Sequence, residues 1–435
     1  MREMKNSGIP WIGEIPKVWT IELIGNQVKE VNNPNTDGLE DNALQFKMGT
    51  IISKSRGDSK YNPETLEGYN IVDKGVIMLN GLNLSFDLIS QRVGLVRERG
   101  VITSTYLAIK PTKNIDSEYL TYLFKAYDNC KAFHSMGRGL RQTLSYGELR
   151  KYLLLYPSLE EQQRIAEFLD RKCAEVDEMI ALQEQIIEEL KAYKQSVITE
   201  AVTKGLNPAA PMRDSGIEWI GQIPEHWEVK PIKYIKSKEK KSFADGPFGS
   251  NLKSEHFVEN GDVLVIESGF ITTGKFIYKD FKTITKEHFE TIKRSECKAK
   301  DIIIAKIGAN YGMSGELPVL YKPSVVSGNS LKITLDNKKY LNPIFVYAMM
   351  TAKSNKGFLD LVQENAQPAL SLSGLNNFRL PSAPIEEQQA IADYLDDKCA
   401  DIDSLIQTKQ SKIDSLKEYK KSIIYEYVTG KKEVE

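Results

Sequence analysis

Residues 159–180 read LEEQQRIAEFLDRKCAEVDEMI, and residues 385–406 read IEEQQAIADYLDDKCADIDSLI, so the two stretches are identical at 13 of 22 positions. In each copy apolar residues recur with the four-three spacing of a heptad, which predicts a long helix with one apolar seam. The residues of the two predicted seams are Leu169, Cys173, Val176, Ile180, Ile187 and Leu190 in the first copy and Leu395, Cys399, Ile402, Ile406, Ile413 and Leu416 in the second.

Polar residues interrupt both seams at matching positions. These are Gln183 and Lys194 in the first copy, and Lys409 and Lys420 in the second. A sustained repeat of 3.5 residues predicts a left-handed coiled coil, in which polar seam residues can fix the register. The alternative is a pair of separate amphipathic helices, each packed on its own domain.

A shorter phrase is also written twice. Residues 7–19 read SGIPWIGEIPKVW and residues 215–227 read SGIEWIGQIPEHW, with nine of thirteen positions identical. The offset between the phrases is 208 residues and that between the helices is 226, so the intervening segment is 18 residues longer in the second half. The chain is therefore an internal duplication of phrase, variable segment and helix. All four tryptophans lie in the two phrases: Trp11, Trp19, Trp219 and Trp227. They can be interface anchors, but a structural role in their own domain is favoured.

The variable segments, 20–156 and 228–382, show no convincing alignment with each other. In both, short β-rich runs such as GVIMLNGLNL and DIIIAKIGAN alternate with helical patches. The expected fold class is α+β, with two globular α/β domains separated by two long helices that form an antiparallel coiled coil. The expected boundaries are 1–156 and 206–382 for the domains, and 157–205 and 383–435 for the helices.

Composition places the 435-residue chain among ordinary globular proteins, with 41% hydrophobic and 27% charged residues. Its four cysteines form no C-x-x-C pair, and its first residues include no apolar signal region. The longest apolar stretches are far shorter than a membrane span. We therefore expect a cytoplasmic protein with reduced thiols and without a membrane anchor.

A net charge of −1 hides a segregation of charge along the chain. Segment 20–156 carries 17 basic and 15 acidic residues, and segment 228–382 carries 23 and 16. The helical stretches are acidic, with 6 basic and 11 acidic residues in 160–205 and 7 and 10 in 386–431. Because phosphate binding needs local positive charge, this distribution favours DNA binding by the variable segments.

Taken together, the tandem layout, the repeated EEQQ-x-I-A-x-(F/Y)-L-D motif and the W-I-G-x-I-P-x-x-W phrase resemble the specificity subunit of type I restriction-modification systems. The resemblance covers essentially the whole chain. It implies two target-recognition domains, each reading one half of a split, asymmetric DNA sequence, and helices that set the spacer. It also implies that one chain imitates a two-fold symmetric dimer and offers equivalent docking surfaces to two modification subunits.

Parts of the variable segments also resemble target-recognition domains of that family. YNPETLEGYNIVDKGVIMLNGLNL is similar to one common class, and GPFGSNLK with DIIIAKIGANYG to another. A related pattern precedes each helix, but Glu364, Asn365 and Ala366 stand where the first copy has Gly137, Arg138 and Gly139. The second copy therefore departs from the first at the position of Arg138, a candidate base contact.

Candidate DNA contacts follow from side-chain chemistry. Arginine and lysine suit guanine edges or phosphates, and asparagine suits adenine. Arg138 and Arg141 lie in a glycine-flanked loop, and Lys306 follows an apolar strand; for each, the alternative is a solvated surface charge. The full set of candidates is Lys47, Arg56, Asn80, Asn83, Arg92, Arg138, Arg141, Ser250, Lys253, Lys306, Asn310 and Tyr311.

Catalytic motifs are missing from the sequence. There is no phosphate-binding loop, no H-E-x-x-H and no G-x-S-x-G, and the four histidines have no metal-ligand spacing. We expect a chain without catalytic residues, metal or cofactor of its own. The resemblance assigns S-adenosylmethionine to modification subunits, and ATP and magnesium to restriction subunits. The competing hypotheses are a coiled-coil scaffold without DNA specificity, a specificity subunit that serves methylation only, and a self-sufficient enzyme.

Overall fold

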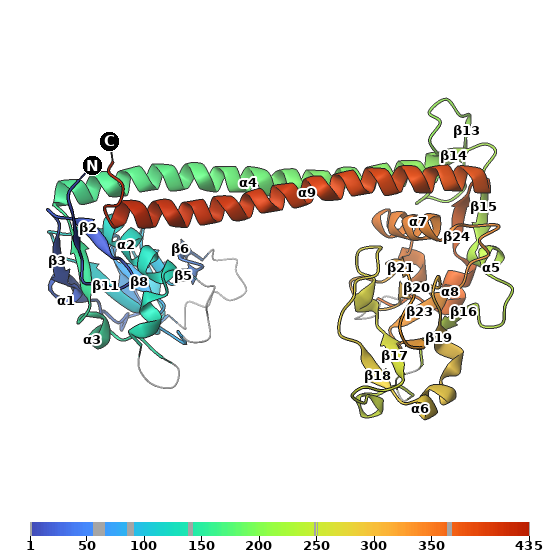
Figure 1. Cartoon of the computed structure of the whole chain (residues 1–435), viewed down its shortest axis with the longest axis horizontal. Helices are drawn as coiled ribbons and strands as arrows, with labels where there is room; N and C mark the ends of the chain where they lie inside the picture. The colour runs from blue at the N-terminus through green and yellow to red at the C-terminus, as the bar shows by residue number, and fades with distance from the viewer. Residues whose placement is uncertain are drawn as a thin grey trace. The chain divides into compact units, whose positions relative to one another are not determined.

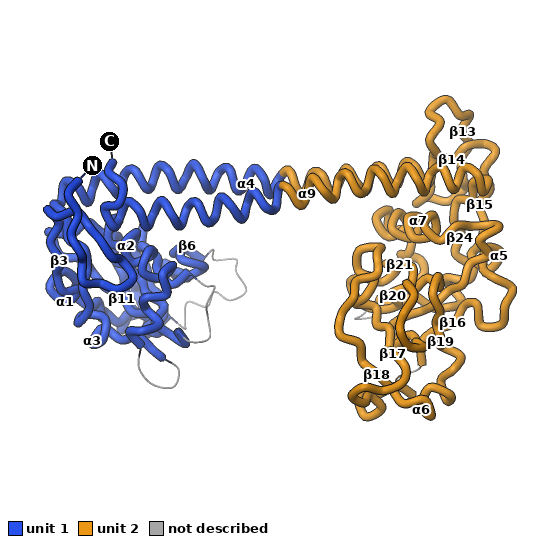
Figure 2. Tube along the Cα trace, in the orientation of Figure 1, with its two compact units in different colours: residues 1–185, 409–435 blue, residues 186–408 orange. Residues whose placement is uncertain are grey.

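A computed structural model of the chain describes residues 2–54, 66–84, 91–137, 142–247, 249, 251–362 and 368–434. The chain divides into two compact units (Figure 2). Unit 1 comprises residues 1–185 and 409–435, and unit 2 comprises residues 186–408. Both long helices begin in one unit and end in the other, so the units do not coincide with the domains expected from the repeats.

Unit 1 begins with the first tryptophan phrase, which forms a hairpin, and continues into small sheets and short helices. Its strands are β1 (Met4–Asn6), β2 (Glu14–Pro16), β3 (Thr20–Leu23), β4 (Val28–Glu30), β5 (Leu44–Lys47), β6 (Thr50–Ser53), β7 (Asn70–Val72), β8 (Ile77–Leu79), β9 (Val93–Leu95), β10 (Gly100–Ile102), β11 (Leu107–Pro111) and β12 (Leu153–Tyr156). Its helices are α1 (Ile24–Gln27), α2 (Ser117–Asn129), α3 (Tyr146–Leu149) and a 3-10 turn, Ala132–Ser135.

Unit 2 repeats part of this order of elements and adds others. Its strands are β13 (Met212–Asp214), β14 (Gln222–Pro224), β15 (Glu228–Pro231), β16 (Phe243–Asp245), β17 (Val263–Ile266), β18 (Lys282–Ile284), β19 (Glu296–Cys297), β20 (Ile302–Ala305), β21 (Ser314–Glu316), β22 (Ser324–Val326), β23 (Ser330–Ile333) and β24 (Arg379–Ser382). Its helices are α5 (Ile232–Ile235), α6 (Lys286–Thr291), α7 (Asn342–Ser354), α8 (Leu372–Asn377) and 3-10 turns at Ser254–His256, Ser268–Phe270, Lys293–Ser295 and Leu359–Leu361.

The duplication extends through the variable segments, although their sequences do not align. Unit 1 has a four-stranded antiparallel sheet in the order β4-β11-β8-β9, and unit 2 has one in the order β16-β23-β20-β21. A second antiparallel pair, β7 with β10, matches β19 with β22. Unit 2 adds β17 and β18 to the other edge of β22. The two segments, unlike in sequence, therefore have the same framework.

Each unit has its own apolar core. In unit 1, Phe124 and Leu123 of α2 pack with Ile165 and Leu169 of the long helix α4 (Leu159–Lys204). In unit 2, α7 lies between the sheet β16-β23-β20-β21 and the long helix α9 (Ile385–Val428) (Figure 1). Asp116 caps α2, since its carboxylate accepts hydrogen bonds from the next turn of backbone N–H groups.

The long helices α4 and α9, of 46 and 44 residues, run antiparallel. Within unit 1, Lys420 forms an ion pair with Asp177 at 2.6 Å, and the rings of Phe168 and Tyr427 are 4.3 Å apart. Within unit 2, Lys194 forms an ion pair with Asp403 at 2.6 Å. In all three pairs one residue number rises as the other falls, as antiparallel packing requires. The predicted fold class, two mixed domains and two long packed helices, is confirmed.

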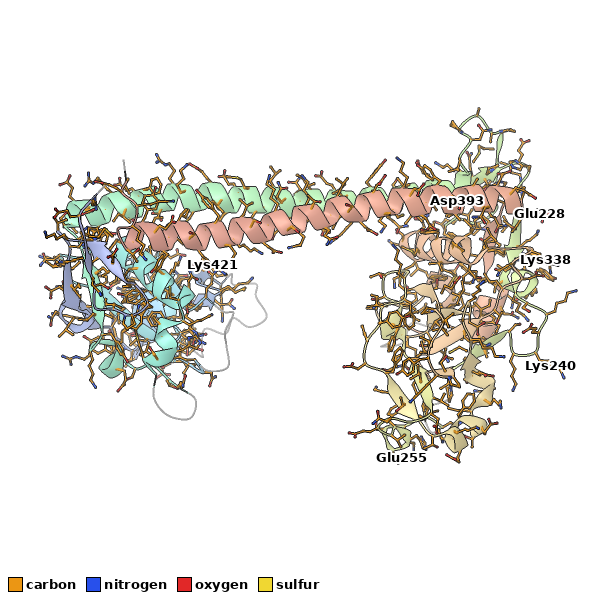
Figure 3. The ribbon with its side chains drawn as sticks, in the orientation of Figure 1. Glu228, Lys240, Glu255, Lys338, Asp393 and Lys421 are labelled. Atoms are coloured by element: carbon orange, nitrogen blue, oxygen red, sulfur yellow. The ribbon has the colours of Figure 1, made fainter. Side chains whose placement is uncertain are left out.

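Acidic residues begin both long helices, at Glu160 and Glu161 in α4 and at Glu386 and Glu387 in α9. Carboxylates are favourable there because the first turn of a helix carries partial positive charge. Charged side chains also cover the outer faces of the helices, with Asp393 and Lys421 as examples (Figure 3). Among the described residues, no helix has both the length and the apolar character needed to cross a membrane.

Candidate nucleic-acid interface

The repeated phrase is held by the start of a long helix in each unit. In unit 1 the indole Nε1 of Trp19 donates to Glu161 Oε2 at 2.9 Å. In unit 2 the Nε1 of Trp227 donates to Glu387 Oε2, also at 2.9 Å. Both indoles are almost fully buried. The second tryptophan of the phrase is therefore hydrogen-bonded to the second glutamate of EEQQ in both units, which explains why the two motifs are repeated together.

The glutamine that follows each glutamate ties the helix to its own domain. Gln162 Nε2 donates to the carbonyl of Pro157 at 2.9 Å, and its Oε1 accepts from the backbone N–H of Asp116 at 2.8 Å. Gln388 repeats the arrangement with Ala383 and Leu341, at 2.8 and 2.9 Å. Both glutamine residues are fully buried. We call these tryptophan and glutamine contacts the frame contacts.

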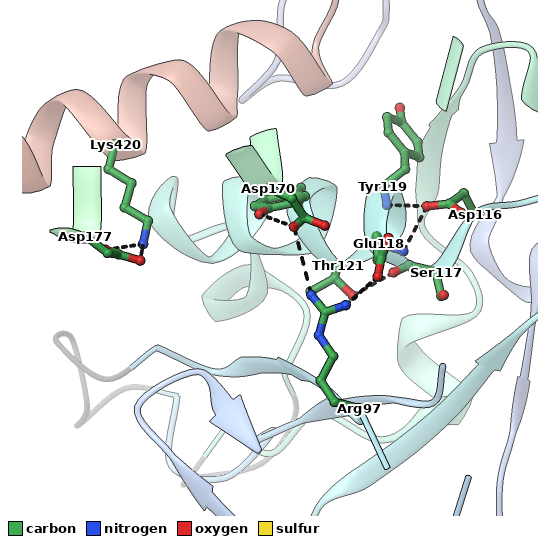
Figure 4. Close-up of polar contacts among 10 residues, drawn as sticks. Arg97, Asp116, Ser117, Glu118, Tyr119, Thr121, Asp170, Asp177 and Lys420 are labelled. Carbon is green, nitrogen blue, oxygen red and sulfur yellow. Dashed lines mark hydrogen bonds and ion pairs between the residues drawn. The ribbon is translucent and has the colours of Figure 1, made fainter. Parts of the chain in front are cut away.

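A tyrosine from the domain helix reaches each long helix as well. The hydroxyl of Tyr122 donates to Asp170 at 2.7 Å, and that of Tyr347 donates to Asp396 at 2.8 Å. Burial raises the pKa of both hydroxyls, and the carboxylate beside each raises it further. In unit 1, Arg97 lies beside Asp170 and also forms an ion pair with Glu118 (Figure 4). The domain helices are thus fixed against α4 and α9 by equivalent polar contacts.

The predicted seam residues lie on the two long helices, α4 and α9. Each of the twelve is buried or half-buried: Leu169, Cys173, Val176, Ile180, Ile187, Leu190, Leu395, Cys399, Ile402, Ile406, Ile413 and Leu416. The interrupting lysines Lys194 and Lys420 form the two cross-helix ion pairs. These pairs are equivalent, because the offset of 226 that relates the helices also relates Asp177 to Asp403.

In unit 1, the loop that follows β8 carries three of the predicted DNA contacts. Asn83 is exposed with a φ of +49°, and Asn80 is half-buried. Arg92 is only 1% exposed, and its Nη1 donates to the carbonyls of Asn80 and Leu82 at 2.9 and 2.8 Å. This placement gives Arg92 a supporting role in the loop, in place of the surface position expected of a residue that contacts DNA. Lys47 is exposed on β5.

Four of the predicted contacts lie outside the described residues: Arg56, Arg138, Arg141 and Ser250.

In unit 2, predicted contacts gather in the loop that follows β20. Asn310 is exposed, while Lys306 and Tyr311 are half-buried. The ammonium of Lys353 lies 4.7 Å from the centre of the Tyr311 ring and donates to the carbonyl of Tyr311 at 2.9 Å. Lys253 is exposed beside the 3-10 turn at Ser254–His256. Lys306, Asn310 and Tyr311 therefore lie in one loop directly after β20.

Sequence reasoning did not identify the carboxylate beside Lys306 or the arginine that shares this carboxylate. The carboxylate of Asp245 lies 3.7 Å from Lys306 Nζ and 3.6 Å from Arg294 Nη2. It also missed the stacked imidazoles of His256 and His288, whose ring centres are 4.0 Å apart. No sequence spacing points to these contacts, because the residues come from separate segments that meet only in the folded protein.

No arrangement for catalysis is evident in the part of the chain that the structure describes. No group of three or more His, Cys, Asp or Glu side chains there is placed to hold a metal ion. The four cysteines are free, and burial raises the pKa of each thiol, that of Cys297 to about 12. A reactive cysteine needs a lowered pKa, so none is prepared to act as a nucleophile.

Comparison with known proteins places these features in one family. The family described as type I restriction modification DNA specificity domain matches residues 93–192 and 224–418, more than half of the chain. The MjaVIII type I restriction enzyme specificity subunit of Methanocaldococcus jannaschii is 24% identical over 426 residues, covering 96% of this chain and 93% of that protein.

Solved structures show the same fold. A chain from a study of complex assembly and conformational transition of the type I R-M system has a TM-score of 0.69 at 14% identity, covering 96% of this chain and 99% of its own. The HsdS subunit from Thermoanaerobacter tengcongensis has a TM-score of 0.50 at 13% identity, covering 96% and 98%. The resemblance seen in the repeated motifs is thus confirmed, and the chain belongs to the type I restriction-modification DNA specificity family.

Proposed function

We propose that each unit reads one half of a two-part DNA sequence, and that the chain directs a type I restriction-modification complex to that sequence. One observation supports this most strongly. The two units share the order of one four-stranded sheet and the same frame contacts, but they carry different residues in the loops that follow β8 and β20. Shared contacts that maintain a fold, combined with loops that differ, are what two readers of different half-sites need.

The surface chemistry of these loops supports DNA contact. Lys47 and Asn83 of unit 1, and Lys253 and Asn310 of unit 2, are exposed. Lysine binds phosphates or guanine edges, and asparagine can bond adenine in the major groove. Both variable segments are net basic, whereas the helices are net acidic. The variable segments rather than the helices would therefore contact the DNA backbone.

We infer that the chain works with catalytic partners. The two halves of the chain repeat the same frame contacts. This repetition suits two copies of a modification subunit, one on each half of the pseudo-two-fold chain. S-adenosylmethionine would then bind in those modification subunits, and ATP with magnesium in restriction subunits. Because the substrate is the DNA of the cell or of an invading phage, we infer that the complex works in the cytoplasm.

Mapping of methylated adenines tests this function. The gene is deleted from its host and then restored, and the genome is sequenced by a method that detects methylated bases. A two-part methylated sequence should disappear with the gene and return with it. An unchanged methylation pattern would contradict the proposal. Plating phage on the same strains shows whether restriction accompanies methylation or whether the complex only methylates.

The helices have a test of their own, because we propose that their length sets the spacer between half-sites. One heptad is inserted into α4 after Gln185 and one into α9 after Thr408. Seven residues preserve the seam and add about 10.5 Å of helix. The methylated sequence should keep both half-sites and gain about three base pairs of spacer, since neighbouring base pairs are about 3.4 Å apart. An unchanged spacer in an active complex would show that the helices do not set it.

A further inference from the structure

A charged cluster in unit 2 lies beside the loop that follows β20. Asp245, the last residue of β16, places its carboxylate between Lys306 and Arg294, with nitrogen to oxygen distances of 3.7 and 3.6 Å. The side chains of Asp245 and Lys306 are 18% and 17% exposed, and that of Arg294 is 53% exposed. We call these three residues the Asp245 cluster.

The backbone around the Asp245 cluster is tightly fixed. The hydroxyl of Ser295 donates to the carbonyl of Asp245 at 2.9 Å, and the N–H of Lys306 donates to the carbonyl of Asn329 at the same distance. A Cβ on Gly246 would lie 1.8 Å from the carbonyl oxygen of Ser327, so only glycine fits there. These contacts therefore fix the backbone from which the side chains of Asp245 and Lys306 extend.

The Asp245 cluster does not belong to the framework that the two units share. The carbonyl of Lys306 accepts from the N–H of Leu370 at 2.9 Å, and in unit 1 the carbonyl of Gly81 accepts from the N–H of Leu144 at 2.8 Å. Lys306 thus occupies the position of Gly81, which has no side chain. Since unit 1 forms the same sheet with glycine at this position, the fold does not require the lysine.

The charges of the Asp245 cluster argue against a plain phosphate contact. A surface that only binds phosphates gains affinity from each cation and loses it with each carboxylate. A carboxylate between two cations restricts where they can lie, which favours a defined base edge over neighbouring phosphates. Lysine and arginine read guanine through its O6 and N7 atoms.

We propose that Asp245 is a specificity-determining residue that positions Lys306 and Arg294 toward bases of the half-site read by unit 2. This inference rests on the proposed function, because it assumes that unit 2 reads DNA. It assigns a role to a residue that itself repels DNA. Removal of its charge should therefore strengthen binding to unrelated DNA and weaken discrimination.

The test compares Asp245→Asn with Glu267→Gln in complexes reconstituted with the chain's own modification subunits. Glu267 pairs with Lys282 at 2.8 Å in the same unit, so its variant also removes one carboxylate and releases one lysine. Dissociation constants are measured at several salt concentrations for four duplexes. These carry the mapped sequence, the same sequence with one base pair changed in the first half-site, the same sequence with one base pair changed in the second half-site, or no site.

For Asp245→Asn we expect discrimination at the second half-site to fall by about tenfold, within the range that one good base contact provides. Binding to the duplex without a site should be stronger, with a steeper salt dependence, because a released cation can meet a phosphate. Discrimination at the first half-site should not change, and Glu267→Gln should behave as the unaltered chain. Equal discrimination in both variants would overturn the inference.

A double variant separates positioning from direct contact. If Asp245 acts through Lys306, then Asp245→Asn should have little effect on discrimination in a chain that already carries Lys306→Met. Full additivity of the two changes would overturn this route. Should Asp245→Asn fail to fold, Lys306→Met and Arg294→Met replace it, and unchanged discrimination in both would overturn the inference. Absence of discrimination in the unaltered complex would instead overturn the proposed function.

Discussion

Units 1 and 2 are the same fold with different surfaces. Trp19 and Trp227 bond equivalent glutamates at 2.9 Å, and Gln162 and Gln388 make equivalent pairs of hydrogen bonds. The loop positions do not match in this way, since Lys306 stands where unit 1 has Gly81. The difference teaches that the repeated motifs maintain the attachment of each reader to the helices, while the residues that differ are those free to choose a sequence.

Among the variants that test the equivalence of the two units, removal of the tryptophan side chains should lower stability most. We expect Trp19→Ala and Trp227→Ala each to lower the free energy of unfolding by about 3–5 kcal/mol, because each empties a buried site of an aromatic ring. Denaturant titration followed by circular dichroism measures both. If one variant is neutral and the other is severe, the two frames are not equivalent.

Loss of the glutamine contacts should cost less. Gln162→Ala and Gln388→Ala leave a buried backbone N–H and a carbonyl without their partners, which costs about 1–3 kcal/mol in each unit. Hydrogen exchange at Asp116 and Leu341 should accelerate in the matching variant only. Equal acceleration in both units after either change would argue against independent frames.

The ion pairs between α4 and α9 should contribute least to stability. Lys420 and Lys194 are partly exposed at 28% and 23%, and such pairs are worth about 0–1 kcal/mol and weaken in salt. A double-mutant cycle with Lys420→Met and Asp177→Asn measures one pair, and Lys194→Met with Asp403→Asn measures the other. A coupling above about 2 kcal/mol in either would mean that the pair is a principal determinant of helix register.

The long helices were predictable from sequence because heptad spacing is a local signal, and the structure has them at Leu159–Lys204 and Ile385–Val428. The partner of Trp19 was not, since Glu161 is 142 residues away. Nor was the common sheet order. Strands such as IML in β8 and IIIA in β20 share only their burial, which many apolar sequences satisfy.

Individual DNA contacts were the least predictable feature. A sequence shows that Arg92 is basic, but it does not show that three carbonyls of the loop at 80–83 surround its guanidinium. The carboxylate beside Lys306 was missed for the same reason, because Asp245 lies on β16, and Arg294, which also contacts Asp245, lies on a 3-10 turn.

One chimaera tests the central claim most directly. Residues 24–152 of unit 1 are replaced by residues 232–378 of unit 2, so that both sets of frame contacts carry the variable segment of unit 2. The exchange begins at α1 and α5 and ends just before β12 and β24, which are equivalent elements of the two frames. Methylated bases are then mapped in a strain that carries only the chimaera. We expect an inverted repeat in which both half-sites equal the second half-site of the unaltered chain. An asymmetric sequence, or a new half-site at the unaltered end, would contradict the account of two independent readers on one duplicated frame.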